Sequence, residues 1–234
     1  EEVVCMGPTG TPTEIPSNSN VVLLGGGLGN AVLFSIAKAC KEAGSKVLYF
    51  AGYKHGEDLF KRDEVEAATH QVIFSTDTGD FIEPRRPLDS HFRGNIVQAM
   101  IGYSNGDFGE KLFPLQEANH LIAIGSDRMM AAVKAARHDP ELLQPHMGEH
   151  VAIASINSPM QCMMKKVCAQ CLQRHVDPET GKEEFVFSCF DQDQKMDDVD
   201  FKFLNARLRQ NTVLEKLSAN LIGMMTDSVD LPHI

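Results

Sequence analysis

The sequence predicts an α/β protein with a five-stranded doubly wound parallel sheet and a small, cysteine-rich C-terminal domain. From Asn20 onward, short apolar runs alternate with helical patterns, as they do where crossover helices join parallel strands. Beyond Ser158 this alternation ends, and four of the six cysteines lie between Cys162 and Cys189. We therefore expect an N-terminal segment over residues 1–19, the sheet domain over residues 20–157 and the cysteine-rich domain over residues 158–234.

The N-terminal segment is expected to contain a short strand, residues 3–6, and then a linker rich in glycine, proline and serine. A lone strand ahead of a linker has no partner strand in this sequence, so we interpret it as the remnant of an upstream domain. The chain begins with Glu1 and Glu2 rather than with methionine, a basic region and an apolar stretch. We therefore expect a processed product or a piece of a longer protein, without a secretory signal.

Five short apolar runs are the expected strands of the sheet, and they cover residues 21–24, 46–51, 72–75, 121–124 and 151–156. Apolar residues at helical spacing from Val32 to Cys40 predict a helix that Gly44 ends. Further helices are expected at residues 57–69, at 95–101, at 126–137 with Ser126 or Asp127 as its cap, and along the tail from 199 to 225. The stretch 81–109 is otherwise irregular, and we expect a long excursion there.

The composition excludes several classes of protein. With 43% hydrophobic side chains, the 234 residues can bury a large core, which excludes disorder for most of the chain. The excess of 32 Asp and Glu over 22 Lys and Arg gives a net charge of −10, the wrong sign for a nucleic-acid binder. No run of about 18 apolar residues is free of turn signals, so we expect a soluble protein that does not span a membrane. Clustered cysteines beside 11 methionines favour the reducing cytoplasm over a disulfide-linked secreted protein.

A glycine-rich turn follows the first strand and opens the first helix. Its residues are Gly25, Gly26, Gly27, Leu28, Gly29 and Asn30. Backbone N–H groups and the helix dipole at such a turn can hold the phosphates of a nucleotide. The alternative is that the glycines only let the strand turn tightly against the sheet.

The segment after the second strand bears on the type of nucleotide. Asn30 occupies the third glycine position of the dinucleotide fingerprint, and Tyr53, Lys54 and His55 stand where an acidic residue usually holds the ribose of NAD. An ordinary NAD-type Rossmann site is therefore disfavoured. Lys54 or His55 is suited to pair with the 2′-phosphate of NADP, while a solvated loop lysine remains an open alternative.

Two further strand ends lie on the same edge of the expected sheet, where open α/β sheets place their ligands. One is a second strand-to-helix turn with Gly125, Ser126, Asp127, Met129 and Met130. The two methionines fit a helix core as well as a site lining. The other strand end carries Asp77, which is equally suited to a role as a turn former.

Cys162, Cys168, Cys171 and Cys189 supply four thiolates, the number that a tetrahedral zinc ion or a [2Fe–2S] cluster requires. If a hairpin turns at residues 177–182, the paired positions sum to about 360, and Cys171 faces Cys189 across the two strands. The short spacing of the other two cysteines then brings them alongside.

Two alternatives to a [2Fe–2S] cluster exist. Four buried thiols in a core are disfavoured, because Lys165, Lys166 and Gln170 make the segment too polar. Structural zinc sites usually pair two short-spaced knuckles, whereas three cysteines ahead of a distant fourth are typical of plant-type [2Fe–2S] ligation. We therefore favour the [2Fe–2S] cluster over zinc.

The motifs together resemble the ferredoxin-NADP reductase-like electron-transfer subunits, over nearly the whole chain from about Val4 to Asn211. That family includes the electron-transfer subunit of dihydroorotate dehydrogenase and the small subunit of NADH-dependent ferredoxin:NADP oxidoreductase. The resemblance rests on Gly7-Pro8-x-Gly10, the turn from Gly25 to Asn30, Thr76-Asp77-x-Gly79, Gly125-x4-Met130, the four cysteines, Ser188-Cys189-Phe190 and Asp198-Val199-Asp200-Phe201.

The resemblance implies an FAD-binding barrel upstream, an NAD(P)-binding domain over residues 20–157 and a [2Fe–2S] domain over residues 158–234. It also implies that the Gly25 to Asn30 turn holds the nucleotide phosphates, that Asp77, Gly125, Met129 and Met130 border the nicotinamide and the flavin, and that the four cysteines bind the cluster. Electrons would flow between NAD(P)H, FAD and the cluster, with a second redox subunit or a fused reductase domain as partner.

The expected function is thus that of a fragment of a flavin and iron–sulfur oxidoreductase, in which we assign no catalytic residue. The alternative from a different class is a non-catalytic nucleotide-binding module with a structural zinc site of four cysteines.

Overall fold

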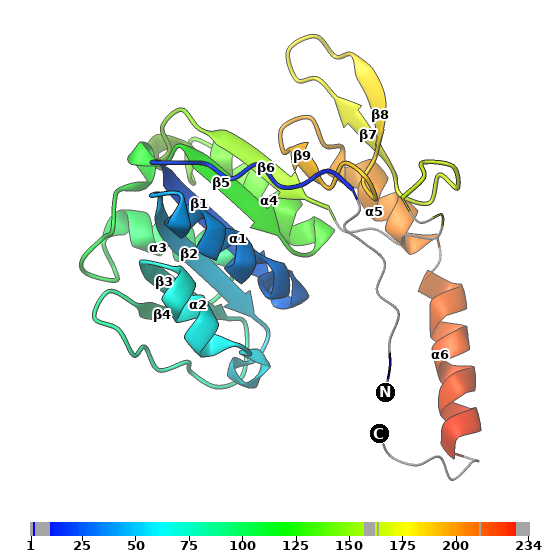
Figure 1. The fold of residues 1–234 in the computed structure, drawn as a ribbon, viewed down its shortest axis with the longest axis horizontal. Coiled ribbons are helices and arrows are strands. Elements are labelled where there is room, and N and C mark those ends of the chain that lie inside the picture. Colours follow the sequence, from blue (N-terminus) through cyan, green and yellow to red (C-terminus); the bar gives the residue numbers. More distant parts are fainter. Residues whose placement is uncertain (1, 3–9, 157–161, 163, 211, 228–234) are drawn as a thin grey trace.

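The computed structural model of the chain describes residue 2 and residues 10–156, 162, 164–210 and 212–227. The strand expected at residues 3–6 and the domain boundary expected between residues 157 and 158 lie outside these ranges. Within them, seven strands form one mostly parallel sheet, and two more form a hairpin beside it (Figure 1). No helix in the described part of the chain is long and apolar enough to cross a membrane.

The sheet has the strand order β4-β3-β2-β1-β5-β6-β9, and only β9 runs antiparallel to its neighbour. Its strands are β1 (Asn20–Gly26), β2 (Lys46–Tyr53), β3 (Gln71–Thr76), β4 (Ser90–Arg93), β5 (His120–Ile124), β6 (Val151–Ser155) and β9 (Asp193–Lys195). The five predicted runs are confirmed as β1, β2, β3, β5 and β6. The predicted number of strands is wrong, because β4 and β9 are short, polar edge strands that no apolar run signals.

Helices cover both faces of the sheet. One core cluster includes buried residues of α1 (Asn30–Glu42) and α2 (Arg62–Ala68). The other includes buried residues of α3 (Ile96–Asn105) and α4 (Asp127–His138). Alternate residues of β1 divide between them: Val21 and Leu23 pack in the first cluster, Val22 and Leu24 in the second. The sheet is therefore doubly wound, as predicted.

The predicted helix at residues 57–69 is wrong in its first half. A short 3-10 turn covers Gly56–Asp58, and α2 begins only at Arg62. Between them Lys61 has φ of 52°, a left-handed conformation that no right-handed helix includes.

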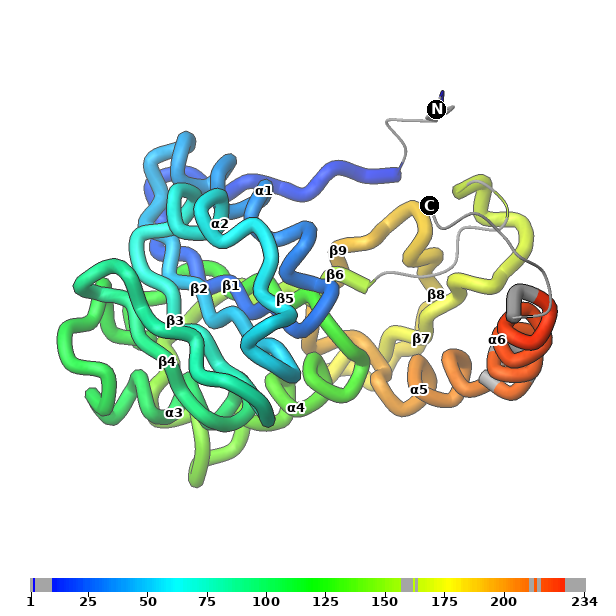
Figure 2. Tube along the Cα trace, turned by 90° about the horizontal axis from the view of Figure 1, so that it is seen from below, coloured from blue at the N-terminus to red at the C-terminus, as the bar shows by residue number. Residues whose placement is uncertain are grey.

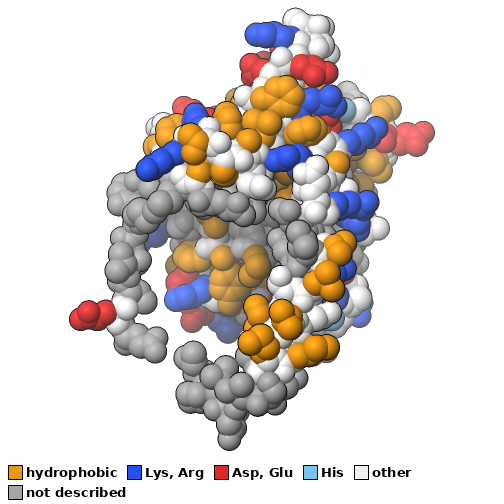
Figure 3. All heavy atoms as spheres, turned by 90° about the vertical axis from the view of Figure 1, so that its right-hand side faces the viewer, with side chains coloured by type: hydrophobic (Ala, Val, Ile, Leu, Met, Phe, Trp, Pro, Cys, Tyr) orange, Lys and Arg blue, Asp and Glu red, His pale blue; other side chains and the backbone are white. Residues whose placement is uncertain are grey.

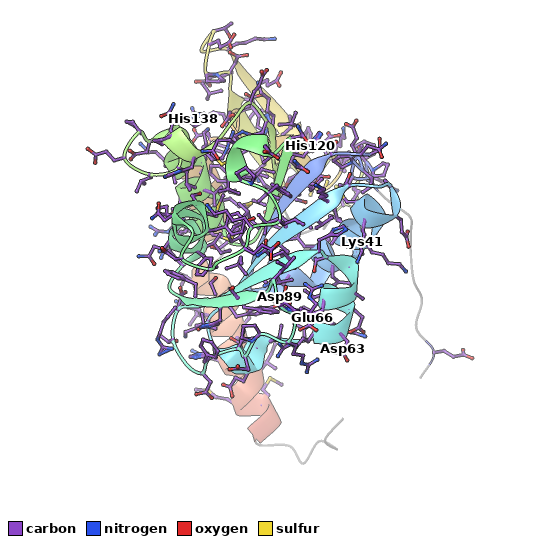
Figure 4. All side chains as sticks on the ribbon, turned by 90° about the vertical axis from the view of Figure 1, so that its left-hand side faces the viewer. Lys41, Asp63, Glu66, Asp89, His120 and His138 are labelled. Carbon is purple, nitrogen blue, oxygen red and sulfur yellow. The ribbon has the colours of Figure 1, made fainter. Side chains whose placement is uncertain are left out.

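The excursion predicted at residues 81–109 contains both β4 and α3. The segment ahead of β4 is held against α2 by the ion pair Arg85–Asp63 (2.7 Å) and by two arginines that donate to backbone carbonyls. Arg62 of α2 donates to the carbonyl of Glu83, and Arg86, which is paired with Asp89 (2.7 Å), donates to the carbonyl of Glu66. Figure 4 shows Asp63, Glu66 and Asp89 close together, far from His138. The excursion is therefore an ordered part of the fold.

The cysteine-rich part is joined to the sheet domain through main-chain hydrogen bonds. Its hairpin consists of β7 (Leu172–Val176) and β8 (Glu183–Phe187), and the chain then enters the sheet as β9, beside β6. The N-terminal linker touches both parts, because Thr11 N donates to the carbonyl of Phe190 (2.8 Å) and Ser45 Oγ donates to that of Pro16 (2.7 Å).

Two helices end the described chain, α5 (Phe201–Arg209) and α6 (Thr212–Asp227), where the sequence predicts a helical tail. Helix α6 lies at the end of the molecule opposite the β4 edge (Figure 2). Apolar side chains gather on its exposed surface (Figure 3), among them Val213 and Met224, which are 67% and 72% exposed.

Candidate functional site

A cavity of 1180 Å³ opens at the carboxyl ends of β1, β2, β3 and β5. The order of the sheet reverses between β1 and β5, because α1 leads from β1 to one side while β5 lies on the other. Open α/β sheets bind their ligands outside such a reversal point. The cavity is lined by Gly26, Gly27, Leu28, Gly29, Gly52, Tyr53, Lys54, Ser75, Asp77, Asn95, Ile96, Val97, Gln98, Ile101, Ile124, Gly125, Ser126, Arg128, Met129, Ala132, Ala135, Ala136 and Leu142.

The glycine-rich turn forms one wall of this cavity and is pressed against the neighbouring elements. A Cβ atom on Gly29 would stand 2.2 Å from the carbonyl oxygen of Ile124, and one on Gly26 would stand 2.6 Å from Sδ of Met129. Gly27 differs, because it has φ of 55° and open space where its Cβ would be. A phosphate can therefore approach the backbone at Gly27 without obstruction.

Asn30 lies under the turn rather than in the cavity. Its side chain is buried, donates from Nδ2 to the carbonyls of Gly27 and Gly52 (both 3.0 Å) and accepts the hydroxyl of Tyr49 (2.5 Å). Gly25 is not in the cavity lining either. A Cβ atom on Gly25 would stand 1.9 Å from Asn30 Oδ1, so the amide of Asn30 occupies the space beside this glycine. Asn30 therefore fastens the β1–α1 turn to β2.

The first turn of α4 forms the opposite wall. Ser126 caps the helix by accepting the backbone N–H of Met129 (3.2 Å), and both residues line the cavity with Gly125. Asp127 and Met130 do not. Asp127 faces α5, and Met130 is 2% exposed in the core between the sheet, α3 and α4.

Opposite charges stand at the ends of β2 and β3, where Lys54 and Asp77 both line the cavity. Their backbones are adjacent, since Asp77 N donates to the carbonyl of Tyr53 (3.2 Å). The Tyr53 hydroxyl is buried and has no hydrogen-bond partner in the described part of the chain, and burial raises its pKa. His55 is not in the lining, and its Nδ1 is 3.3 Å from Thr78 Oγ1.

Sequence reasoning missed a third wall of the cavity, the start of α3. Asn95 caps this helix by accepting the N–H of Gln98 (3.0 Å), and the Gln98 side chain accepts the N–H of Asn95 (3.0 Å). The backbone N–H groups of Ile96 and Val97 are thereby left at a helix N-terminus that borders the cavity. The spacing of Asn95 and Gln98 was the available signal. Arg128, a further cation in the lining, was also missed.

The four clustered cysteines are brought together as two pairs of thiols. Cys162 forms a hydrogen bond with Cys168, and Cys189 forms one with Cys171. The charge of Cys162 also raises the pKa of Cys189. Cys171 and Cys189 are buried, Cys162 is half-buried and Cys168 is exposed. No group of three or more His, Cys, Asp or Glu side chains among the described residues has the geometry to hold a metal ion. A two-iron cluster takes its thiolates two to each iron.

The hairpin register differs by one residue from the predicted one. Asp177 N donates to the carbonyl of Lys182 (3.0 Å), which closes the turn so that Leu172 pairs with Phe187. Cys171 therefore stands opposite Ser188, whose N–H donates to its carbonyl (3.1 Å), and not opposite Cys189. The two thiols still meet, because Cys189 is the next residue along.

Backbone N–H groups of the loop between Cys162 and Cys171 donate to two of the sulfur atoms, those of Cys162 and Cys189. Hydrogen bonds from Cys168 and Val167 lower the pKa of the Cys162 thiol to about 6, whereas burial and the adjoining Cys171 raise the pKa of Cys189 to about 11. Three non-glycine residues of the loop have left-handed backbones: Met164, Lys166 and Ala169, with φ of 61°, 58° and 56°. Successive N–H groups in such a loop form a concave nest for anions, including iron–sulfur clusters.

No protein-family model matches the chain. It is 28% identical over 218 residues to an uncharacterized protein of Rickettsia prowazekii (strain Madrid E), covering 93% of this chain and 21% of that protein. It is 33% identical over 125 residues to a "dihydroorotate dehydrogenase B (NAD(+)), electron transfer subunit homolog" of Thermotoga maritima, covering 53% of this chain and 38% of that protein.

One solved structure, of an NADH-dependent reduced ferredoxin-NADP oxidoreductase, matches with a TM-score of 0.67 and 26% identity, over 93% of this chain and 67% of that chain. The chain is related to the ferredoxin reductase-like electron-transfer subunits. The predicted resemblance is confirmed, and it supports a redox electron-transfer role. The chain spans 21% and 38% of the lengths of the two curated relatives described above.

Proposed function

We propose that this chain is the part of an NAD(P)H-dependent flavin and iron–sulfur oxidoreductase that binds the nucleotide and a [2Fe–2S] cluster. The observation that carries the proposal is the pairing of four thiols at a loop whose N–H groups donate to the sulfur atoms of Cys162 and Cys189. A thiolate cluster is anionic, and such N–H groups stabilise it.

The cavity is the proposed nucleotide site. Gly26, Gly27 and the N-terminus of α1 would hold the pyrophosphate, since Gly27 lets phosphate oxygens reach the backbone. Gly125, Ser126 and Met129 on the opposite wall would border the nicotinamide. Asp77 would lie on the nicotinamide side, and Lys54 would face the adenosine end, where open α/β sheets hold the ribose.

Cys162, Cys168, Cys171 and Cys189 would ligate the cluster, one thiol pair to each iron. NAD(P)H gives two electrons as hydride and a [2Fe–2S] cluster takes one, so a flavin held outside the described residues connects them. We place that FAD in an adjoining domain and expect a second redox subunit or fused reductase domain as the further partner. Free thiols of this kind persist in the reducing cytoplasm, where we expect the protein to act.

Anaerobic purification followed by iron, sulfide and zinc analysis tests the proposal. We expect about two irons and two sulfides per chain, with visible absorption that dithionite bleaches. Zinc in their place, with no visible absorption, would favour the nucleotide-binding module with a structural metal and would overturn the electron-transfer assignment.

A further inference from the structure

Arg207 on α5 holds the loop that carries two of the four cysteines. Its Nη2 donates to the carbonyl of Ala169 (2.6 Å) and to that of Gln170 (3.3 Å), the two residues between Cys168 and Cys171. The contact joins residues 38 positions apart in the sequence. A guanidinium is therefore fixed at the base of the cysteine loop.

One donor of this guanidinium is unused. Nε of Arg207 is buried and has no hydrogen-bond partner in the described part of the chain, whereas Nη1 reaches Gln210 Oε1 (3.4 Å). A buried N–H without a partner costs free energy, so such a group in a native fold calls for an acceptor. The nearby anionic groups that the proposed function supplies are the cysteine thiolates and the cluster between them.

The guanidinium is carried on a helix that is anchored at several points. Asp200 caps α5 by accepting the N–H groups of Lys202 (2.9 Å) and Phe203 (3.0 Å), and it also accepts Nε of Arg174 (2.9 Å). Leu204 is buried, and Asn205 is bonded to Asp127 of α4. Arg207 therefore presents its charge to the loop without a large loss of side-chain freedom.

We propose that Arg207 is a positioning residue that raises the reduction potential of the [2Fe–2S] cluster, an inference that rests on the proposed function. Uptake of one electron from the reductant, without a proton, makes the four-thiolate cluster one charge more negative. A fixed positive charge and an unused N–H donor at the loop stabilise that reduced form more than the oxidised one.

The test is a redox titration of the anaerobic protein, followed by its visible absorption and by the electron paramagnetic resonance of the reduced form. At the wild-type midpoint, Arg207→Gln should lower the ratio of reduced to oxidised cluster about tenfold, which is 59 mV for one electron. Arg207→Lys keeps the positive charge but loses the planar guanidinium and its Nε donor. Its midpoint potential should therefore fall between those of the wild type and Arg207→Gln. Arg209→Gln, on the exposed side of the same helix turn, should match the wild type.

Three outcomes separate the two proposals. An unchanged midpoint in both Arg207 variants, with iron and sulfide at wild-type content, would overturn the role of Arg207 and leave the proposed function standing. Absence of iron and sulfide from the wild type would overturn both. If Arg207→Gln does not retain the cluster, the midpoint of Arg207→Lys decides, because a value equal to the wild type would contradict the donor and fork role.

Discussion

The side-chain amide of Asn205 donates to the carboxylate of Asp127 across 2.5 Å, and this contact joins α5 to the first turn of α4. That turn of α4 borders the cavity, while α5 reaches the cysteine loop two residues further on, through Arg207. One short helix thus contacts an element of each candidate site.

Cys171→Ser should remove the visible absorption and reduce the iron content to near zero, because the lost thiolate leaves one iron under-ligated in a site that folds with its metal. Cys40→Ala is the matched control, since Cys40 is a buried thiol on the core-facing side of α1. It should keep full iron content and cost about 1 kcal/mol in the free energy of unfolding. Equal iron in the two variants would exclude Cys171 as a ligand.

Gly27→Asn should weaken the binding of NADPH and of NADH at least about tenfold, because the new side chain occupies the open space where a phosphate would approach. Asparagine tolerates the φ of 55° at this position, whereas a β-branched residue would add backbone strain. Gly181→Asn, at φ of 69° in the hairpin turn, controls for the substitution itself. Fluorescence titration of both variants measures the affinities. Wild-type affinities in Gly27→Asn would place the nucleotide elsewhere.

Lys54→Ala should lower the ratio of NADPH affinity to NADH affinity about tenfold, because a charge-assisted hydrogen bond to the 2′-phosphate is worth about 1.5 kcal/mol. Lys54 stands at the end of β2 in the cavity lining, whereas the control residue Lys38 is on the exposed surface of α1. Calorimetric titration of Lys54→Ala and Lys38→Ala with each nucleotide gives the ratio. The same ratio in all three proteins would identify Lys54 as a solvated loop residue.

Asp197→Asn should lower the free energy of unfolding at pH 7 by about 2 kcal/mol, because the buried Arg137 loses a charged acceptor at 3.0 Å. Burial opposes ionisation of Asp197, but hydrogen bonds from His138 and Arg137 outweigh it and hold its pKa below the ordinary value. A carboxyl with a lowered folded pKa stabilises the fold above its unfolded pKa, and this contribution is lost as the pH falls through the folded pKa.

The difference in the free energy of unfolding between the wild type and Asp197→Asn should therefore begin to narrow below about pH 3.9, the ordinary pKa of aspartate, and should close below the lowered folded pKa. Urea unfolding at pH 7, 5 and 3.5 measures it. Asp63→Asn, which disrupts the exposed pair with Arg85, should cost under about 1 kcal/mol at every pH. A gap for Asp197→Asn that persists unchanged at pH 3.5 would show that its charge is not what stabilises the contact.

The isolated chain should show negligible reduction of dyes by NADPH or NADH, because hydride delivers two electrons together and the cluster accepts one. Joining an FAD-binding domain at the N-terminal side should restore the activity. Steady-state dye reduction, run on both proteins at equal cluster content, is the measurement. Rapid turnover by the 234-residue chain without added flavin would contradict the proposed electron path.

The apolar runs predicted the central strands because those strands are buried on both faces, as β3 shows with all six residues buried. Edge strands could not be predicted in this way. β4 reads Ser-His-Phe-Arg and β9 reads Asp-Gln-Lys, and what makes them strands is pairing with β3 and β6 rather than their own side chains.

The candidate sites divide in the same way. Gly26, Gly27, Lys54 and Ser126 could be placed at one sheet edge because chain order fixes which strand ends carry them. Met130 could not be separated from Met129 by sequence, since the direction of a helix face depends on tertiary packing. Arg207 carried no signal at all, because its partners lie in a distant loop and are backbone carbonyls, which every residue has.

The antiparallel pairing of β9 with β6 has a consequence for any attempt to divide this chain. Removing the cysteine-rich part would remove β9 and expose the main-chain N–H and C=O groups of β6 over residues 153–155. Ala154 and Ser155 are buried there. An uncovered strand edge of this kind invites pairing with a second chain and hence aggregation. A shortened chain should therefore keep the cysteine-rich segment through Lys195, so that the strand that covers the edge of the sheet is retained.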